Sequence, residues 1–394
     1  MRKQKAENEK QKAENEKQEP ETRNQKPAIS RQKAANRKQE RIRQMKKLNV
    51  AVFFGGCSSE YSVSLQSASA VIRNLNPEKY HVIPVGITKE GDWYYAPNAG
   101  ADMDADRWYT ETDCIPAILS PNRSDHSLLL LQKDGVRKLP VDVAFPVLHG
   151  KNGEDGTMQG LIQLAGIPLA GCGILASALC MDKYRAHQMV KDAGVCVPRA
   201  LVLTRGMDVK DAEPFADEIG YPLFVKPVKA GSSYGISIVY EPQNLRHAVA
   251  HAFQYDDEVI IEEKIDGFET GCAVLGNDEL LIGEVDEIEL SKGFFDFTEK
   301  YTLQTSAIHV PARIRREQAD QIKKTAGVIY KTLGCRGFAR VDLFLKPDGG
   351  IVFNEVNTIP GFTEHSRFPA MMKAVGYSFT EILDRILELA LDTK

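Results

Sequence analysis

No stretch of the 394-residue sequence is apolar over the roughly 18 residues that a membrane-spanning helix needs, so we expect no transmembrane segment. The seven cysteines are odd in number and scattered, and no two of them form a CxxC pair. No export signal is recognisable, because the charged N-terminal residues are not followed by an apolar core. We therefore expect neither a disulfide framework nor a structural zinc site, and reduced thiols favour a cytoplasmic enzyme.

Two common signatures of phosphoryl transfer are also missing. The sequence has no GxxxxGK[ST] loop, which argues against a P-loop nucleotide site, and it has neither an HRD nor a DFG motif, which argues against a protein kinase. The overall composition is that of an average globular protein, with 43% apolar and 26% charged residues. A net charge of −4 gives no reason to expect nucleic acid as a partner.

The charge is unevenly distributed along the chain. Residues 1–47 contain 16 Lys/Arg and 7 Asp/Glu, a net of +9, so the other 347 residues carry a net of −13. The segment repeats QKAENEK with alanine as the only apolar residue in each heptad, which leaves a coiled coil nothing to bury. We expect residues 1–46 to form a disordered basic tail, with a basic arm that touches nucleic acid or anionic lipid as the alternative. Met45 is a second candidate for the start of the folded protein.

The rest of the chain alternates strand and helix patterns. Residues 49–54 (NVAVFF) form a β-branched and aromatic run that ends in two glycines, and helical spacing follows over 63–75. Further strands are expected at 81–87 and 141–148. This order predicts an open α/β sheet over residues 47–170, whose ligands bind at the carboxyl ends of the strands.

Two further regions follow this first domain. Strands are expected at 223–225, 236–239 and 259–262, and helices at 181–193, 316–333 and 379–391. We place a central subdomain at 171–265 and a C-terminal subdomain at 266–394. The fold class expected from the pattern is α/β.

A glycine-rich loop lies between two of these strands. Residues 226–235 (KPVKAGSSYG) combine glycines, serines and lysines, which supply backbone N–H groups and positive charge for phosphate. A strand leads into the loop and another leads out of it, so the loop joins a hairpin. Any nucleotide would therefore be held by a pair of strands and not by a helix N-terminus.

An acidic constellation lies near the C-terminus. Arg340 and Asp342 share one face of a strand, and Glu355 and Asn357 share one face of the next, because residues two apart point the same way. Across a hairpin the four side chains converge into an oxygen-rich pocket with one guanidinium. Two carboxylates and an amide suit Mg²⁺. The alternative is a solvated strand face with an ordinary ion pair.

Seven motifs in order resemble the D-alanine–D-alanine ligases of the ATP-grasp superfamily. The resemblance covers about 47–390, and within the family it is closest to the vancomycin-resistance branch that makes D-alanyl-D-serine. It implies an ATP-grasp fold, with a Rossmann-like N-terminal domain, a small central domain and a C-terminal catalytic domain. The motifs are GGCSSEYSVS (55–64), FPVLHGKNGEDG (145–156), SALCMDK (177–183), KPVKAGSSYGIS (226–237), EKY (299–301), RGFARVD (336–342) and NEVNTIPGFTEHSRFP (354–369).

The resemblance implies a role for each matching residue. Glu60 would take the ammonium group of the first D-alanine, in a hydrogen-bonded triad with Ser232 and Tyr301, and Arg340 with the Gly361 N–H would stabilise an oxyanion. Ser366 joins this catalytic group. The residues implied for the amino-acid substrates are His149, Phe295 and Arg367. Those implied for ATP are Lys183, Lys226, Gly231, Ser233, Glu262, Glu269 and Lys300. Those implied for two Mg²⁺ ions, or for Mn²⁺ in their place, are Asp342, Glu355 and Asn357.

The implied reaction activates a carboxylate. The γ-phosphoryl group of ATP is transferred to D-alanine, and the amine of a second D-amino acid attacks the acyl phosphate. A lid over 290–305 would exclude water. Arg367 and Phe295 favour D-serine over D-alanine as the second substrate, and Tyr301 argues against D-lactate. The product is a peptidoglycan precursor, which associates the protein with vancomycin resistance, and the family implies a homodimer.

Three alternatives remain open. The first is a housekeeping D-alanine–D-alanine ligase. The second is another ATP-grasp enzyme, such as a biotin-dependent carboxylase subunit, against which Glu60 and the EKY motif count. The third is a non-catalytic nucleotide-binding module, which would have eroded metal ligands. His247 and His251 have metal-like spacing, but without a third ligand we interpret them as a surface pair.

Overall fold

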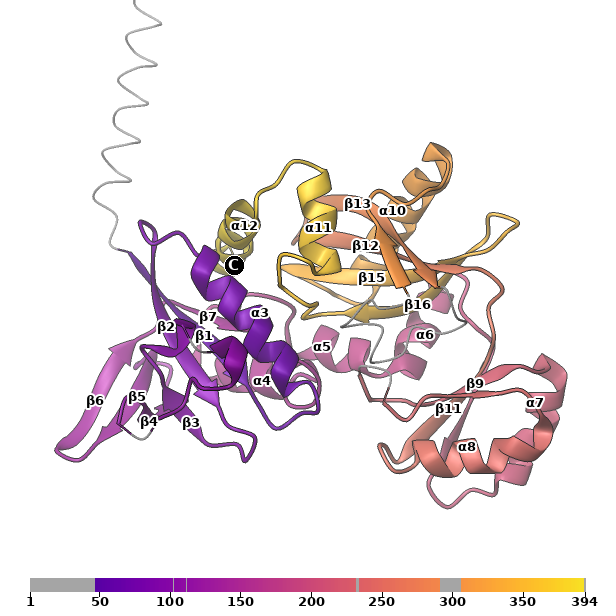
Figure 1. Cartoon of the computed structure of the whole chain (residues 1–394), viewed down its shortest axis with the longest axis horizontal. Coiled ribbons are helices and arrows are strands. Elements are labelled where there is room, and N and C mark those ends of the chain that lie inside the picture. Colours follow the sequence, from indigo (N-terminus) through magenta and orange to yellow (C-terminus); the bar gives the residue numbers. More distant parts are fainter. Residues whose placement is uncertain (1–46, 102, 111, 232–233, 291–305, 393–394) are drawn as a thin grey trace, which may run out of the picture. The chain divides into compact units, whose positions relative to one another are not determined.

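The computed structural model describes residues 47–392, except 102, 111, 232–233 and 291–305 (Figure 1). The tail over 1–46 and most of the expected lid lie outside the described residues. Leu48–Lys394 form one compact unit. None of the helices in the described part is long and apolar enough to cross a membrane.

A seven-stranded sheet forms the first part of this unit, in the order β6-β5-β4-β3-β2-β1-β7. β1 pairs in parallel with β2 and β7, and the remaining pairs are antiparallel. The loop after β1 leads directly into helix α3, as the pattern of a strand, two glycines and a helix predicts. The elements are β1 (Leu48–Gly55), α3 (Tyr61–Asn74), β2 (Tyr80–Ile87), β3 (Trp93–Tyr95), β4 (Ile115–Leu119), β5 (Ser127–Gln132), β6 (Gly135–Pro140), β7 (Val143–Pro146), α4 (Thr157–Ala165) and α5 (Ile174–Met181).

A four-stranded antiparallel sheet follows, in the order β10-β9-β11-β8. β9 and β10 pair directly, which confirms the hairpin expected around the glycine-rich loop. One helix boundary differs from expectation: instead of one helix over 181–193, α5 ends at Met181 and α6 begins at Lys183. Asp182 separates them because its carboxylate caps α6 by accepting from the Arg185 N–H. The elements are α6 (Lys183–Asp192), β8 (Ala200–Thr204), α7 (Glu213–Ile219), β9 (Leu223–Pro227), β10 (Ser237–Val239), α8 (Leu245–Ala252) and β11 (Glu258–Glu263).

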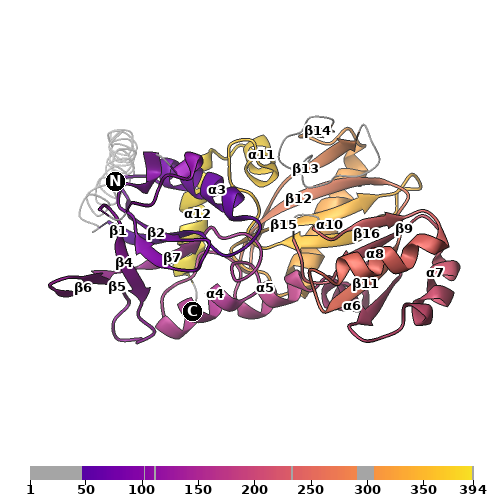
Figure 2. The same cartoon turned by 60° about the horizontal axis from the view of Figure 1, so that its bottom comes forward.

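A five-stranded antiparallel sheet completes the unit, in the order β14-β13-β12-β15-β16. Turned by 60° about the horizontal axis, the view in Figure 2 shows this sheet beside the four-stranded one, with α6 near their junction. The elements are β12 (Phe268–Gly276), β13 (Leu280–Leu290), β14 (Ser306–His309), α10 (Arg316–Thr332), β15 (Phe338–Leu345), β16 (Ile351–Asn357), α11 (Arg367–Ala374) and α12 (Phe379–Leu391).

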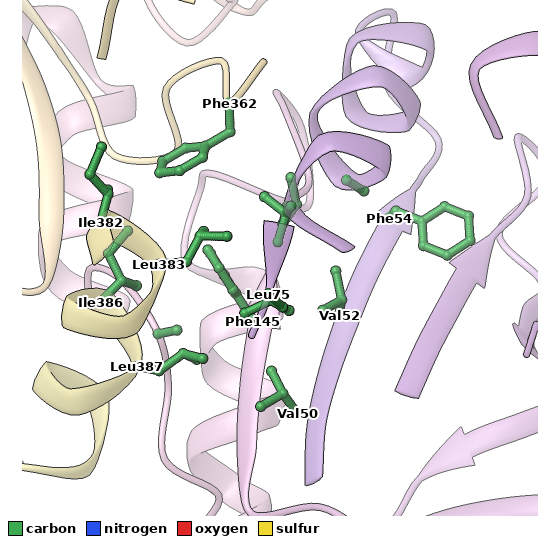
Figure 3. Packing of buried hydrophobic residues seen from close by; sticks show 14 of the residues in the cluster. Val50, Val52, Phe54, Leu75, Phe145, Phe362, Ile382, Leu383, Ile386 and Leu387 are labelled. Carbon is green, nitrogen blue, oxygen red and sulfur yellow. The ribbon is translucent and has the colours of Figure 1, made fainter. Parts of the chain in front are cut away.

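The last helix packs back onto the first sheet. α12 carries apolar side chains at helical spacing, including Ile382, Leu383 and Ile386, and they share a buried cluster with Val50 and Phe145 (Figure 3). Ser378 and Glu381 form a capping box that fixes where the helix begins. Burial of this apolar face ties the C-terminal residues to the N-terminal sheet, so residues from both ends of the unit meet around one cavity.

Candidate active site

A pocket lies where the first sheet, the start of α6, the glycine-rich loop and the β15–β16 hairpin meet. Its lining includes ten of the residues that the sequence singles out, and these come from segments separated by up to about three hundred residues. The ten are Glu60, His149, Lys183, Gly231, Arg340, Glu355, Asn357, Gly361, Ser366 and Arg367. The fold therefore brings these motifs together around a single cavity.

Glu60 lies buried between two glycines, with 7% of its surface exposed. A Cβ atom on Gly150 would come within 2.4 Å of Glu60 Oε2, and one on Gly231 within 2.7 Å. Gly150 has a φ of +73°, which is a conformation that other residues adopt only with strain. Both glycines are therefore required for the close approach of their loops to this carboxylate.

His149 is held by hydrogen bonds on the same side of the pocket. Its Nε2 lies 3.0 Å from Ser67 Oγ, which also accepts from the Phe362 N–H at 3.1 Å. Burial lowers the pKa of His149 to about 4, so the imidazole is neutral at neutral pH. A neutral imidazole can donate or accept a hydrogen bond with a substrate, and it does not repel an ammonium group.

Glu154 is a pocket residue that our reasoning from the sequence missed. Its Oε2 accepts from the Gly150 N–H at 2.8 Å, and its Oε1 accepts from the Ile359 N–H at 3.3 Å, so it joins the first sheet's loop to the segment after β16. Burial, reinforced by the nearby Glu60 carboxylate, raises the pKa of Glu154 to about 8. Its place in the 145–156 motif was the only signal that could have identified it.

Lys183 connects the start of α6 to the glycine-rich loop. Its Nζ donates to the Ala230 carbonyl at 2.7 Å and lies 3.9 Å from Glu355 Oε2. The cation is thus placed between the loop expected to cradle phosphate and an expected metal ligand. This placement suits a group that neutralises phosphate charge.

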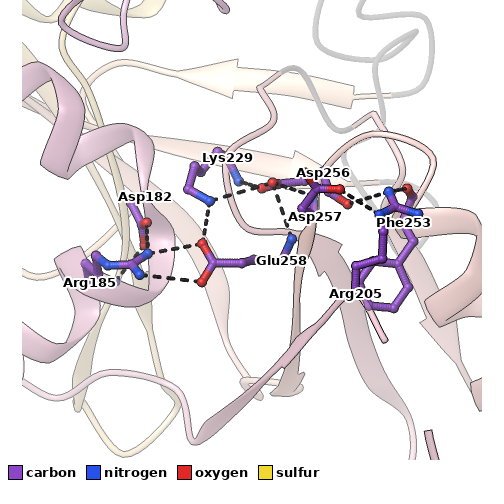
Figure 4. Close-up of polar contacts among 8 residues, drawn as sticks. All are labelled: Asp182, Arg185, Arg205, Lys229, Phe253, Asp256, Asp257 and Glu258. Atoms are coloured by element: carbon purple, nitrogen blue, oxygen red, sulfur yellow. Dashed lines mark hydrogen bonds and ion pairs between the residues drawn. The ribbon is translucent and has the colours of Figure 1, made fainter. Parts of the chain in front are cut away.

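A network of charged side chains anchors the beginning of the same loop (Figure 4). The Lys229 backbone N–H donates to Asp256 Oδ2 at 2.7 Å, and its ammonium pairs with Glu258. Arg185 pairs with Glu258 at 3.2 Å and also with Asp182 at the cap of α6. The loop therefore leaves β9 with its first residues fixed to both β11 and α6.

The acidic constellation forms as the alternation predicts. β15 and β16 are antiparallel, with Arg340 opposite Asn357 and Asp342 opposite Glu355. Arg340 donates to both carboxylate oxygens of Asp342, at 2.8 and 2.7 Å, and Asn357 Nδ2 donates to Asp342 Oδ2 at 2.8 Å. The four side chains thus lie in one polar cluster at the edge of the pocket.

The donor set fits a hard divalent cation. Each carboxylate oxygen has two lone pairs, so Asp342 can accept from Arg340 and still bind an ion together with Glu355 and Asn357. Among the described residues, no three His, Cys, Asp or Glu side chains are grouped as a metal site. The expected set has two carboxylates and an amide, and it relies on substrate oxygens for the remaining positions.

Arg367 lines the pocket, but carboxylates engage its guanidinium. Its Nε and Nη2 donate to Asp286 at 2.7 and 2.9 Å, and its Nη1 lies 3.0 Å from Glu269 and 3.3 Å from Asp342. The side chain is 8% exposed, and Asp286 is completely buried. Asp286 was missed because nothing in the sequence of β13 distinguishes it from the other acidic residues there.

Lys226 and Glu262 pair away from the cavity lining. Lys226 Nζ lies 2.6 Å from Glu262 Oε2 across the β9–β11 pair, and His187 from α6 lies against the other oxygen of Glu262. The structure thus groups two of the expected ATP residues with a histidine that we had not selected from the sequence. Five expected residues lie outside the described part: Ser232, Ser233, Phe295, Lys300 and Tyr301.

His247 and His251 lie on α8, away from this site. His247 is exposed, and His251 Nδ1 is 3.5 Å from Ser237 Oγ. Neither belongs to a group of three metal-binding side chains within the described ranges. His247 therefore fits the interpretation as a surface residue, whereas His251 is only partly exposed.

Comparison with known proteins gives matches over both halves of the chain. A family model described as D-ala D-ala ligase N-terminus matches residues 49–172, and one described as D-ala D-ala ligase C-terminus matches residues 189–388. The vancomycin B-type resistance protein VanB of Enterococcus faecalis is 44% identical over 353 residues, which cover 88% of this chain and 100% of VanB.

Two further similar proteins are named as ligases of particular substrate pairs. A putative D-alanine–D-lactate ligase of Streptomyces coelicolor is 45% identical over 355 residues, covering 89% of this chain and 99% of the relative. The crystal structure of the VanG D-Ala:D-Ser ligase from Enterococcus faecalis superposes with a TM-score of 0.82 at 53% identity, covering 88% of this chain and 100% of VanG.

Proposed function

The chain belongs to the D-alanine–D-alanine ligase family of ATP-grasp enzymes, and from this premise we propose that it joins D-alanine to D-serine. As a member it is an ATP-dependent ligase of peptidoglycan precursor synthesis, and it acts on small amino-acid substrates. The observation that supports the ligase reaction itself is the pocket that combines Glu60, Lys183, Arg340 and Glu355. A non-catalytic module would not retain this combination.

The first half-reaction activates D-alanine. Glu60 binds its ammonium group, and the neutral His149 lies in the same part of the pocket without repelling it. Lys183 and Lys226 neutralise the phosphates while the γ-phosphoryl group passes to the D-alanine carboxylate. Asp342, Glu355 and Asn357 would hold two Mg²⁺ ions, or Mn²⁺ in their place. The metal would supply positive charge that neutralises the phosphates.

The second half-reaction forms the peptide bond. The amine of the second amino acid attacks the acyl phosphate, and the tetrahedral oxyanion receives hydrogen bonds from Arg340 and from the Gly361 N–H. Collapse of this intermediate expels phosphate. Ser366 accepts from the Thr363 N–H at 2.9 Å, which orders the turn that presents the Gly361 N–H. Glu262 and Glu269 would bind the base and ribose of ATP, with Gly231, Ser232, Ser233 and Lys300 around its phosphates.

D-Serine is the proposed second substrate. Arg367 and Phe295 would form a pocket for its hydroxyl group, with Arg367 held in place by Asp286, and Tyr301 in the Glu60–Ser232 triad argues against D-lactate. The similarity to VanG, named a D-Ala:D-Ser ligase, supports this choice. D-Alanine is the second candidate, because the family model is named for the D-alanine dimer.

The test is phosphate release with ATP and D-alanine, supplemented in turn with D-serine, D-alanine at high concentration or D-lactate at neutral pH. We expect D-serine to give the highest kcat/KM for the second site, and a mixed dipeptide by mass spectrometry. Equal or better use of D-alanine would overturn the D-serine assignment but leave the ligase intact.

The biological setting is proposed on the same basis. The names of VanB and VanG associate these relatives with glycopeptide resistance and with D-Ala:D-Ser synthesis, and we propose that this ligase contributes to vancomycin resistance. We also propose a cytoplasmic homodimer. Expression in a susceptible host should raise the inhibitory concentration of vancomycin when a D-serine source is present, and light scattering should give twice the chain mass.

A further inference from the structure

A buried histidine of α6 has one ring nitrogen fixed and the other directed at a carboxylate. His187 Nε2 lies 2.7 Å from the Asn354 carbonyl oxygen. A carbonyl oxygen only accepts, so Nε2 carries the hydrogen. Burial is the main reason why the pKa of His187 lies below its usual range. The ring is therefore neutral near pH 7, and its Nδ1 presents a lone pair.

The group that faces this lone pair is also an acceptor. His187 Nδ1 lies 3.6 Å from Glu262 Oε1, and neither atom has a hydrogen-bond partner among the described residues. Both residues are 2% exposed. Burial opposes ionisation of Glu262, but the charge and the hydrogen bond of Lys226, together with further positive charge nearby, outweigh it and lower the pKa of this carboxyl. Two buried acceptors therefore face each other without a donor, which is costly unless a donor is supplied.

The location of this pair relates it to the nucleotide. His187 follows Lys183 by four residues on the same helix, so both side chains lie on one face of α6, and Lys183 lines the pocket. Lys226 holds the other oxygen of Glu262 at 2.6 Å. The pair is thus bordered by two of the lysines assigned above to the phosphates of ATP.

The histidine cannot easily turn away from this position. Asn354 is the extra residue of a β-bulge, because Leu343 pairs with Phe353 whereas Asp342 pairs with Glu355. Its carbonyl is released from the strand ladder and accepts from His187. The ring also packs edge-on against Phe353, with 5.4 Å between centroids. The direction of Nδ1 is therefore preset before any ligand arrives.

We propose that His187 is a specificity-determining residue for the nucleotide base: its Nδ1 and Glu262 Oε1 together receive the amino group of a 6-aminopurine. The proposal rests on the ATP-binding role given to Glu262 above. An amino group supplies the hydrogens that both acceptors lack. A 6-oxopurine would place a carbonyl oxygen against two acceptors and would be rejected by repulsion and by lost hydrogen bonds.

The first experiment uses the wild-type protein and equilibrium binding without any amino acid. Affinities are measured for ATP, for inosine triphosphate, and for the triphosphate of purine riboside, which has no substituent at C6. We expect ATP to bind at least about tenfold more tightly than either analogue, since each leaves both acceptors unpaired. Equal affinities for ATP and the unsubstituted purine would overturn the proposal.

The second experiment uses His187→Gln, with His247→Gln at an exposed position of α8 as the matched control. The glutamine amide can still donate to the Asn354 carbonyl but offers no acceptor at the position of Nδ1. We expect the variant to bind ATP about tenfold more weakly and to keep its affinity for inosine triphosphate within about twofold, so that the ratio of the two affinities falls. The control should keep both affinities. An equal loss of affinity for both nucleotides, which leaves the ratio of the two affinities unchanged, would indicate a structural role or a bound water and would overturn the proposal.

Two readouts separate this inference from the proposed ligase function. Thermal unfolding checks that His187→Gln is folded, and if it is not, equal wild-type affinities for ATP and the unsubstituted purine remain the outcome that overturns the proposal. Phosphate release with D-alanine is measured independently of binding. Ligase activity with no base selectivity refutes the reading of the amino group by His187 and Glu262 but leaves the proposed reaction standing, whereas selective ATP binding without ligase activity refutes only the proposed reaction.

Discussion

Lys183 Nζ donates a hydrogen bond to the carbonyl oxygen of Ala230, 2.7 Å away, and so joins the first turn of α6 to the glycine-rich loop. The same ammonium group lies 3.9 Å from Glu355 Oε2. One cation therefore contacts both the loop expected to hold the phosphates and the strand expected to hold the metal. Its removal should disturb nucleotide binding at both places.

Lys183→Met should raise the KM for ATP by about tenfold or more, because a charge-assisted contact to phosphate and the tether to the loop are both lost. Lys191→Met, at an exposed position in the last turn of the same helix, is the control. Phosphate release at saturating D-alanine gives the measurement. An unchanged KM for ATP would contradict the assigned role.

Glu355→Gln should reduce kcat by about a hundredfold or more while the protein stays folded, because a neutral amide is a far weaker ligand for a divalent ion. Asp348→Asn, in the exposed turn of the same hairpin, is the control for loss of one acidic charge. Turnover is measured over a series of Mg²⁺ concentrations and the fold by thermal unfolding. Near-normal turnover at all concentrations would refute the metal assignment.

Glu154→Gln should change how stability depends on pH. The pKa of Glu154 is about 8 in the folded protein and 4.5 as its ordinary value, so the folded state binds an extra proton between these values. Its contribution to stability is therefore lost as pH rises from 4.5 through 8. Relative to the wild type, the variant should gain stability over this window and level off above it. Unfolding by urea at several pH values checks this, and a constant difference across the window would argue against it.

Arg367→Leu should lower the free energy of unfolding by about 3 kcal/mol, because it leaves the buried Asp286 carboxylate without its partner. Arg313→Leu is the matched control, since Arg313 pairs with the next residue of β13, Glu287, but is half-exposed. We expect that change to cost about 1 kcal/mol or less. Urea unfolding measures the free energy of unfolding of both variants. Equal losses would mean that the burial of Arg367 adds nothing to the strength of its ion pair.

Glu258→Gln should weaken the charged network at the base of the glycine-rich loop in a salt-dependent way. Lys229 and Arg185 share this carboxylate on a partly exposed surface, so we expect a loss of about 1 kcal/mol or less. The loss should shrink as ionic strength is raised, because the Debye length falls. Thermal unfolding at low and high salt compares the two proteins. A loss that is independent of salt would point to packing instead of charge.

Patterns of period two and of helical spacing predicted about half of the helices and strands, whereas β3 to β6, α4 and α7 were not predicted. The β-branched run at 49–54 became β1, and the hairpins around the glycine-rich loop and the acidic constellation have the expected partners. These features depend on neighbours in sequence, so local rules describe them. The boundary at Asp182 was missed because a cap residue inside a helical pattern is invisible until its side chain is seen to accept from the backbone.

Residues of the candidate site were predicted where they lie in a recognisable motif. They were missed where only the folded structure brings them to the site. Alternation from Phe353 would place Glu355 on the same face of β16, but the bulge at Asn354 puts Phe353 in the core and Glu355 in the pocket. The pairing of His187 with Glu262 and that of Arg367 with Asp286 join segments 75 and 81 residues apart. Such contacts depend on how separate sheets pack, which the spacing of residues along one segment cannot express.

The bulge at Asn354 also determines which change of length this strand can tolerate. Asn354 has no cross-strand partner among the residues that the structure describes, so a chain one residue shorter at this position could keep Asp342 across from Glu355 and Leu343 across from Phe353. What it would give up is the carbonyl that holds His187. A gap at this point between related ligases would therefore be harmless to the carboxylate pair and would release the imidazole to rotate.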